Sequence, residues 1–240
     1  LTMLIALLTA TWDEIRLLKR EMQISAQGAS GDLEYVLGNL DGQPIVAAET
    51  GVGIRRARVG TSFVIQKFKP SLVVVGGFGG ALSSDLNVGD IVLGESVTSL
   101  KKNESQELYC DISLLDLDFK KGPILTESRF INKPDQKKDL FEASNALVVD
   151  METWGVSEAA RQTKTPVISI RAVSDNYNER LPDMAALYGS NGQFDFIKAD
   201  NYFKAAPDLL SPYLKFRFTN SPMASDSLTK FLSALIPNLL

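Results

Sequence analysis

The chain has 240 residues and a formal net charge of −4, which indicates a globular protein whose charge does not suit nucleic-acid binding. The sequence holds no histidine and one cysteine, so Ser-His-Asp triads, Cys-His dyads, disulfide frameworks and histidine-ligated metal sites are excluded. Any chemistry must use carboxylates, hydroxyls, Lys, Arg, Tyr or backbone amides. Residues 3–8 are apolar, but this run is much shorter than the roughly 20 residues needed to span a bilayer, and the charged residues Asp13 and Glu14 follow it closely. We expect a buried first strand, rather than a signal peptide, in a cytoplasmic protein.

Apolar runs typical of strands alternate with amphipathic stretches typical of helices. The β-branched run 72–75 predicts a strand buried on both faces, and Asp41-Gly42 predicts the turn of a hairpin. The other predicted strands are 3–8, 33–37, 44–48, 91–97, 146–149 and 167–173; the predicted helices are 12–22, 55–68, 137–143 and 153–162, and 101–106 is predicted to be a surface loop. The alternation predicts one α/β domain over residues 1–240, in which residues 146–173 form a β-α-β unit.

The last third of the chain has a different composition. Residues 176–193 are polar and rich in turn formers, which predicts a loop or lid. Six of the twelve phenylalanines follow within about forty residues: Phe194, Phe196, Phe203, Phe216, Phe218 and Phe231. Such density is typical of a core or a dimer interface, although it could also roof a site for an apolar substrate. Ser225 is predicted to cap a final helix that carries Leu228, Phe231, Leu232 and Leu235.

Four segments follow or end predicted strands, at the edge where α/β sheets present groups to ligands. In the first, TATWDE, Asp13 favours a helix-terminal role, whereas Glu14 suits either a structural or a chemical role. The second, GGFGGAL over residues 76–82, lets backbone N–H groups approach a ligand closely or forms a tight turn. It lacks the GK[ST] of a P-loop and the GxGxxG spacing of dinucleotide sites.

The third segment is Val149-Asp150-Met151-Glu152. Asp150 can cap the next helix, while Glu152 can accept hydrogen bonds from a sugar diol beside the apolar Met151. The fourth is RAVSD, which ends at Asp175. This aspartate is placed as a general acid if burial favours its protonated form; the alternative is a turn-forming residue.

Taken in order, these segments resemble the nucleoside phosphorylase/nucleosidase superfamily, in particular the methylthioadenosine/S-adenosylhomocysteine nucleosidases and hopanoid-associated nucleosidases. The resemblance rests on TATWDEIRLL, ETGVGIRRARVG, VVVGGFGGALSSDLNVGDIV, GPILTESRFI, VVDMETWGVSEAA and TPVISIRAVSD. It implies a three-layer αβα fold with a twisted mixed central sheet. It also implies a homodimer or larger homo-oligomer that binds a nucleoside and needs no cofactor or metal.

The resemblance also implies roles for individual residues. Glu14 matches the carboxylate that activates the attacking water, and Asp175 matches the acid that protonates N7 of the leaving purine. The positions that match substrate-binding residues are Met151, Glu152, Phe78, Gly79, Phe130, Ile131 and Ser174.

The expected reaction is hydrolysis of the N-glycosidic bond of an adenine nucleoside that resembles methylthioadenosine or S-adenosylhomocysteine, or carries a bulky 5′ group. Arg55, Arg56 and Arg58 could approach an anion, but at helical spacing they are expected to form a solvated face. The carboxylates near the first strand would repel phosphate, which favours water as the nucleophile. A phosphate-dependent nucleoside phosphorylase and a non-catalytic nucleoside-binding or storage protein are the alternatives.

Overall fold

The computed structural model describes residues 3–110, 112, 117–187 and 194–239. The strands are β1 (Ile5–Thr9), β2 (Gln23–Ser30), β3 (Leu33–Leu40), β4 (Gln43–Glu49), β5 (Leu72–Ala81), β6 (Ile91–Ser99), β7 (Glu104–Glu107), β8 (Lys120–Thr126), β9 (Val148–Asp150) and β10 (Val167–Asp175). The α-helices are α1 (Arg16–Glu21), α2 (Ile54–Phe68), α3 (Pro134–Ser144), α4 (Thr153–Arg161), α5 (Phe196–Ala205), α6 (Leu210–Lys215) and α7 (Ser221–Leu235). A π-helical turn, Phe216–Asn220, joins α6 to α7.

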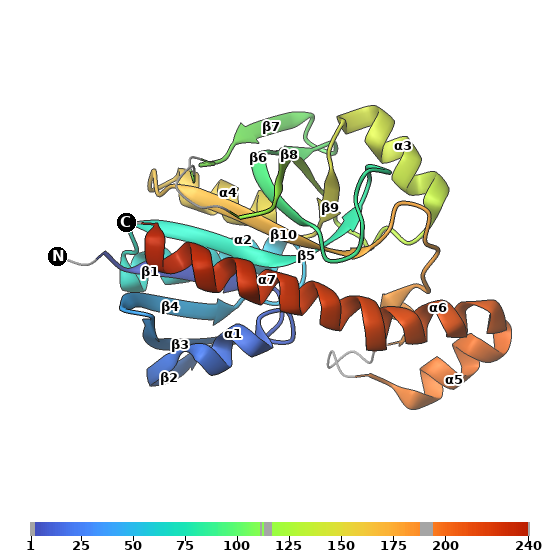
Figure 1. Ribbon diagram of the computed structural model, residues 1–240, viewed down its shortest axis with the longest axis horizontal. Helices are drawn as coiled ribbons and strands as arrows, with labels where there is room; N and C mark the ends of the chain where they lie inside the picture. Colours follow the sequence, from blue (N-terminus) through green and yellow to red (C-terminus); the bar gives the residue numbers. More distant parts are fainter. Residues whose placement is uncertain (1–2, 111, 113–116, 188–193, 240) are drawn as a thin grey trace.

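Helices cover both faces of the sheet (Figure 1). In β1, Ile5 and Leu7 pack in a core that includes Leu228 of α7, whereas the alternate residues Ala6 and Leu8 belong to a core with α2 and α4. This alternation follows from the two-residue period of a strand. The expected three-layer αβα class with a mixed central sheet is confirmed.

The sheet closes on itself at one end. Strand β10 pairs with both β6 and β5, so β10, β6, β8, β9 and β5 form a closed ring, and β1, β4, β3 and β2 extend from β5. Strands β9 and β10 both pair with β5, the first antiparallel and the second parallel. Residues 146–173 are therefore not the predicted β-α-β unit of parallel strands, and that prediction is wrong.

The glycine-rich segment is a strand and not a turn. Strand β5 continues through Gly76–Gly80 because β10 pairs with it along one edge as far as Gly80. On its other edge, β1 pairs up to Val75 and β9 pairs from Gly80 onward. Among the described residues, no strand pairs with this edge between those two points, and the carboxylate of Glu14 accepts from the amide of Phe78 there.

Several local predictions need correction. Helix α1 begins at Arg16 rather than at residue 12, and strand β7 forms within the predicted surface loop. Ser225 lies inside α7 and donates a hydrogen bond to the backbone oxygen of Glu14 at 3.1 Å, so it is not a helix cap. The hairpin at Asp41-Gly42 is confirmed, with both residues at positive φ. Within the described residues, no helix combines the length and apolar character needed to cross a membrane.

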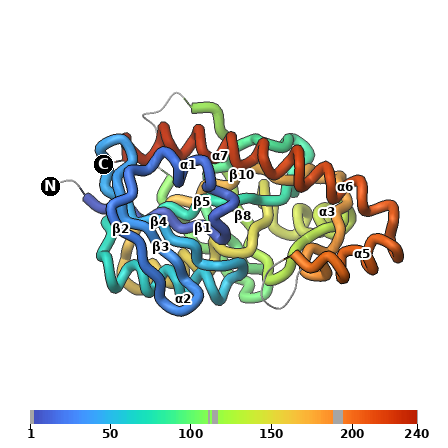
Figure 2. Tube along the Cα trace, turned by 90° about the horizontal axis from the view of Figure 1, so that it is seen from below, coloured from blue at the N-terminus to red at the C-terminus, as the bar shows by residue number. Residues whose placement is uncertain are grey.

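The aromatic residues of the last third serve mainly to pack α5 and α6 together at the end of the molecule farthest from the N-terminus (Figure 2). Phe194 stacks on Tyr213 with 6.0 Å between ring centroids, and Phe203 lies 5.4 Å from the same tyrosine. These rings form a separate small core, whereas Phe196 and Phe218 are exposed. The predicted loop 176–193 includes residues 188–193, which lie outside the described residues.

Candidate active site

Glu14 is buried at the carboxyl end of β1, where four donors hold its carboxylate. One oxygen accepts from the Thr9 hydroxyl at 2.7 Å and from the amides of Ala10 and Thr11 at 3.0 and 3.1 Å. The other accepts from the amide of Phe78 at 2.9 Å, on the unpaired edge of β5. Glu14 therefore takes the place of a strand partner at this edge, which fixes its orientation.

Arg171 reaches the same place from β10. Its side chain is fully buried and forms an ion pair with Asp150, with Nη2 2.6 Å from Oδ2. Nη1 lies 3.8 Å from a carboxylate oxygen of Glu152 and donates to the carbonyl of Phe78 at 3.4 Å. A buried guanidinium needs such partners, because an uncompensated buried charge is strongly destabilising.

Glu152 lies immediately before α4 and points back to the loop that follows β4. Its Oε1 accepts from the amide of Gly53 at 2.9 Å. Burial, opposed by Arg171 and assisted by the negative charges of Asp150 and Glu14, raises the pKa of Glu152 to about 8. At neutral pH its carboxyl group can therefore donate as well as accept a hydrogen bond, which suits a pair of sugar hydroxyls.

Asp150 supports both the start of α4 and the side chain of Arg171. Its Oδ2 accepts from the amide of Thr153, the first residue of α4, at 3.0 Å, and the same oxygen pairs with Arg171. It therefore accepts from the first amide of α4 and holds the arginine, whereas the N-cap position itself is occupied by Glu152 and not, as expected, by Asp150. Asp13, by contrast, lies in the turn before α1 with a side chain 72% exposed, so the expected role in the first turn of a helix is wrong.

Asp175 ends β10 and is 1% exposed. Its Oδ1 accepts from the hydroxyl of Ser174 at 2.7 Å, and its Oδ2 forms an ion pair with Lys137 of α3. The loop that follows is held by Glu179, which accepts from the amide of Asn176 at 2.9 Å. Asp175 is therefore a fixed carboxylate with a dedicated cation rather than a lone buried acid.

Two of the three predicted carboxyl groups adjoin the same strand, β5. A Cβ atom added to Gly77 would lie 2.9 Å from Glu14, and one added to Gly80 would lie 3.1 Å from Asp175. Three residues of strand separate these points, which corresponds to roughly 10 Å. Because side chains alternate along a strand, positions 77 and 80 face opposite sides of β5. Glu152 adjoins the Glu14 end through Arg171.

The remaining predicted site residues have less distinctive surroundings. Phe78 contributes both its amide and its carbonyl to the unpaired edge of β5, Gly79 turns its carbonyl to Ser174 of β10, and Met151 follows β9 and is half-buried. Ile131 is buried in a small apolar core beside Val149, and Phe130 precedes it. Arg55, Arg56 and Arg58 are exposed on α2, as expected. A hollow of about 370 Å³ lies between α2 and the end of α4; Arg58, Phe63 and Gln162 are among its described lining residues, none of which is a carboxylate.

Two residues at the site were missed by reading the sequence. Arg171 stands between apolar residues, Ile170 and Ala172, in a strand that is buried throughout, and a charge at such a position needs a buried partner. Lys137 lies three and four residues before Leu140 and Phe141, which places it on the inward face of α3. The sequence pattern thus pointed to both residues. Lys137 is nevertheless easily assigned to the solvated face of the helix, because it adjoins Lys138 in the sequence.

Comparisons with known proteins show the family of this chain. The family model described as "Phosphorylase superfamily" matches residues 4–110 and 97–201. The 5'-methylthioadenosine/S-adenosylhomocysteine nucleosidase of Staphylococcus aureus strain bovine RF122 / ET3-1 is 26% identical over 199 residues, which cover 73% of this chain and 87% of the relative.

Solved structures show the same fold. That of 5'-methylthioadenosine/S-adenosylhomocysteine nucleosidase from Neisseria meningitidis, in complex with methylthio-immucillin-A, has a TM-score of 0.74 at 20% identity and full coverage of both chains. That of futalosine hydrolase from Helicobacter pylori has a TM-score of 0.75 at 18% identity and 99% coverage of each chain. On the strength of the family match over most of its length, this chain belongs to the phosphorylase superfamily, and the resemblance expected from its motifs is confirmed.

Proposed function

We propose that this protein is a purine nucleosidase that hydrolyses the N-glycosidic bond of an adenine nucleoside of the methylthioadenosine or S-adenosylhomocysteine type, or one with a bulky 5′ group. The observation that carries the proposal is that Glu14 and Asp175 lie beside Gly77 and Gly80 of β5, with Glu152 linked to the Glu14 end through Arg171. The names of the relatives support the substrate class.

In the proposed reaction the bond between C1′ and N9 breaks, and its electron pair moves onto the purine. Water adds to C1′ and passes a proton to Glu14, whose carboxylate is held by four donors. Glu152 binds the ribose hydroxyls, to which its carboxyl group donates as well as accepts hydrogen bonds. Asp175 delivers a proton to N7 of the leaving base; each such acid–base group contributes roughly 10²–10⁴-fold.

The electrostatics at the Glu14 end favour water over phosphate as the nucleophile. Arg171 is the cation at this end, and its guanidinium already faces the carboxyl groups of Asp150 and Glu152. An incoming phosphate would meet these groups and Glu14 at short range, which is unfavourable in a buried site. Hydrolysis therefore fits the arrangement better than phosphorolysis.

The test is release of free base from methylthioadenosine, S-adenosylhomocysteine, adenosine and inosine, each with and without phosphate. We expect adenine from at least one of the two thio-nucleosides without phosphate. A strict phosphate requirement would identify a phosphorylase. Failure to release base from any nucleoside, despite measurable binding, would identify a binding protein.

A further inference from the structure

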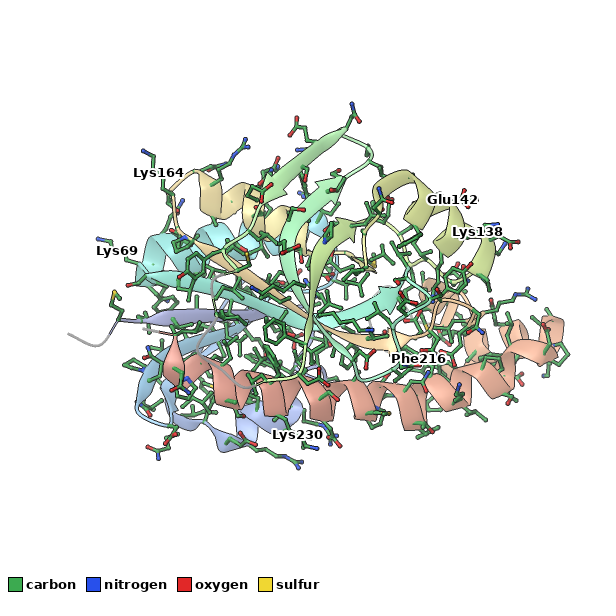
Figure 3. All side chains as sticks on the ribbon, turned by 45° about the horizontal axis from the view of Figure 1, so that its top comes forward. Lys69, Lys138, Glu142, Lys164, Phe216 and Lys230 are labelled. Atoms are coloured by element: carbon green, nitrogen blue, oxygen red, sulfur yellow. The ribbon has the colours of Figure 1, made fainter. Side chains whose placement is uncertain are left out.

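Lys137 is a buried lysine on a helix whose other charged residues face solvent. Its side chain is 0% exposed, and it is the fully buried residue of α3. Its neighbour Lys138 has a side chain 61% exposed and points away from the molecule together with Glu142 (Figure 3). The inward face of α3 thus carries an ammonium group next to the apolar Leu140 and Phe141.

The ammonium group has two partners at the end of β10. It pairs with Oδ2 of Asp175 and donates to the carbonyl of Asn176 at 2.6 Å. Asp175 is the charged group against Lys137 in the described residues, and the Ser174 hydroxyl on Oδ1 is neutral. The next charge along the loop, Glu179, is engaged by Lys215 of α6.

Stability alone does not explain this pair. Taking two charges out of water costs several kcal/mol per ion, and a well-packed apolar pair of similar volume is often as stable or more so. A methionine or leucine at position 137 would fill the inward face of α3 without that cost. The pair is therefore better explained by the chemistry at Asp175.

The chemistry requires a mobile proton at this end of the site. A carboxylate paired with an ammonium group has no proton to give, yet the leaving purine must gain one at N7. The Ser174 hydroxyl is a poor acid, and an arginine side chain in the place of Lys137 would not release its proton. Among the described groups in contact with Asp175, the Lys137 ammonium is the one that holds a transferable proton.

We propose that Lys137 supplies, through Asp175, the proton that the leaving base receives; this inference rests on the proposed function. As the bond between C1′ and N9 breaks, a proton moves from Nζ to the Asp175 carboxylate, and the carboxyl group passes a proton to N7. Lys137 becomes a neutral amine and takes a proton from solvent after the base departs. Lys137 acts through Asp175, so it is a positioning residue rather than a catalytic one.

Two substitutions distinguish a role of Lys137 in proton supply from a purely structural role. Lys137→Met removes the ammonium group, so that burial then favours the protonated form of Asp175 itself. This variant should work at acid pH and lose kcat at a lower pH than the wild type. Lys137→Arg keeps the positive charge but holds its proton, so kcat should fall by about 10²–10⁴-fold at every pH while KM changes little.

The experiment measures kcat and KM from pH 5 to 9.5 with the best nucleoside of the panel, for the wild type, both Lys137 variants and the exposed control Lys138→Met. A second substrate is 4-nitrophenyl β-D-ribofuranoside, whose phenolate leaves without protonation. We expect the Lys137 variants to cleave it at close to the wild-type rate, and Glu14→Gln to lose it.

The results distinguish this inference from the function on which it rests. If Lys137→Met keeps the wild-type pH profile and the wild-type kcat, the inference that Lys137 supplies the proton is wrong, while the proposed function stands. Equal losses on the nucleoside and on the 4-nitrophenyl riboside would also overturn the inference, because they indicate a structural role. If neither variant folds, the wild type alone is measured with both substrates. A loss of kcat at alkaline pH with the 4-nitrophenyl riboside as well as with the nucleoside would then overturn the proton supply, because the phenolate leaves without protonation. A wild-type protein that releases no base overturns the proposed function first.

Discussion

The guanidinium of Arg171 crosses β5 against the backbone of Gly77. A Cβ atom added at Gly77 would lie 2.5 Å from Nη1 of Arg171 and 2.9 Å from Oε1 of Glu14, closer than real Cβ contacts. The absence of a side chain at this one position allows the arginine and the two glutamates to meet. Gly77 is thus required for close approach and not for a turn.

Substituting Gly77 tests this relationship. Gly77→Ala should displace Arg171 and Glu14 by a fraction of an ångström or more, and misplacement near 1 Å can cost about 10²-fold in rate. Overpacking should also lower the free energy of unfolding by about 1–3 kcal/mol. The measurements are kcat and urea unfolding. Gly76→Ala, whose added Cβ meets only flexible leucine side chains, is the control and should retain activity; equal kcat in the two variants would refute the explanation.

Glu14→Gln tests the proposed base. An amide has one acceptor oxygen, so the variant cannot satisfy all four donors that hold the carboxylate, and it cannot take a proton from water. We expect kcat to fall by about 10²–10⁴-fold. The hydrogen-bond donors left without an acceptor should lower the free energy of unfolding by about 1–3 kcal/mol.

The matched control is Asp13→Asn, which makes the same change of charge at the exposed neighbouring carboxylate. Its kcat should equal that of the wild type. A Glu14→Gln variant that keeps more than a tenth of wild-type kcat would remove Glu14 from the reaction.

The raised pKa of Glu152 predicts a stability that depends on pH. In the unfolded chain this glutamate titrates near 4.5, whereas in the folded protein burial raises its pKa to about 8. Between these values the folded state holds a proton that the unfolded state has lost. The contribution of Glu152 to stability is therefore fully present below about pH 4.5 and is lost as the pH rises through 8.

Glu152→Gln should remove this dependence. The Tm of the wild type minus that of the variant should fall steadily between pH 5 and 9, as measured by circular dichroism. Glu158→Gln is the control, because Lys102 lowers the pKa of Glu158 and its contribution is constant over that range. Parallel Tm curves for the wild type and Glu152→Gln would contradict the assignment.

Periodicity predicted the strands whose side chains are apolar, because burial alone specifies them. It missed β2, whose residues are almost all exposed and which forms only by pairing with β3 at the edge of the sheet. It also ended β5 too early, since glycines favour turns locally, whereas pairing with β10 keeps Gly76–Gly80 extended. Tertiary pairing decided both cases.

The sequence motifs predicted the carboxylates of the site but not its cations. Glu14, Glu152 and Asp175 lie in segments that resemble a family; the structure places Glu14 and Asp175 beside β5 and links Glu152 to the Glu14 end through Arg171. Arg171 and Lys137 are recognised only when their burial and partners are known. The expected homodimer stays a prediction, which sedimentation velocity of the full chain can measure.

The most direct measurement is a crystal structure of the slow variant Asp175→Asn with the nucleoside that the wild type cleaves best. We predict the purine beside position 175, the ribose hydroxyls on Glu152, and Glu14 facing C1′ at hydrogen-bond distance from an intervening water. A nucleoside bound away from the unpaired edge of β5, or reached by only one of these side chains, would contradict the account.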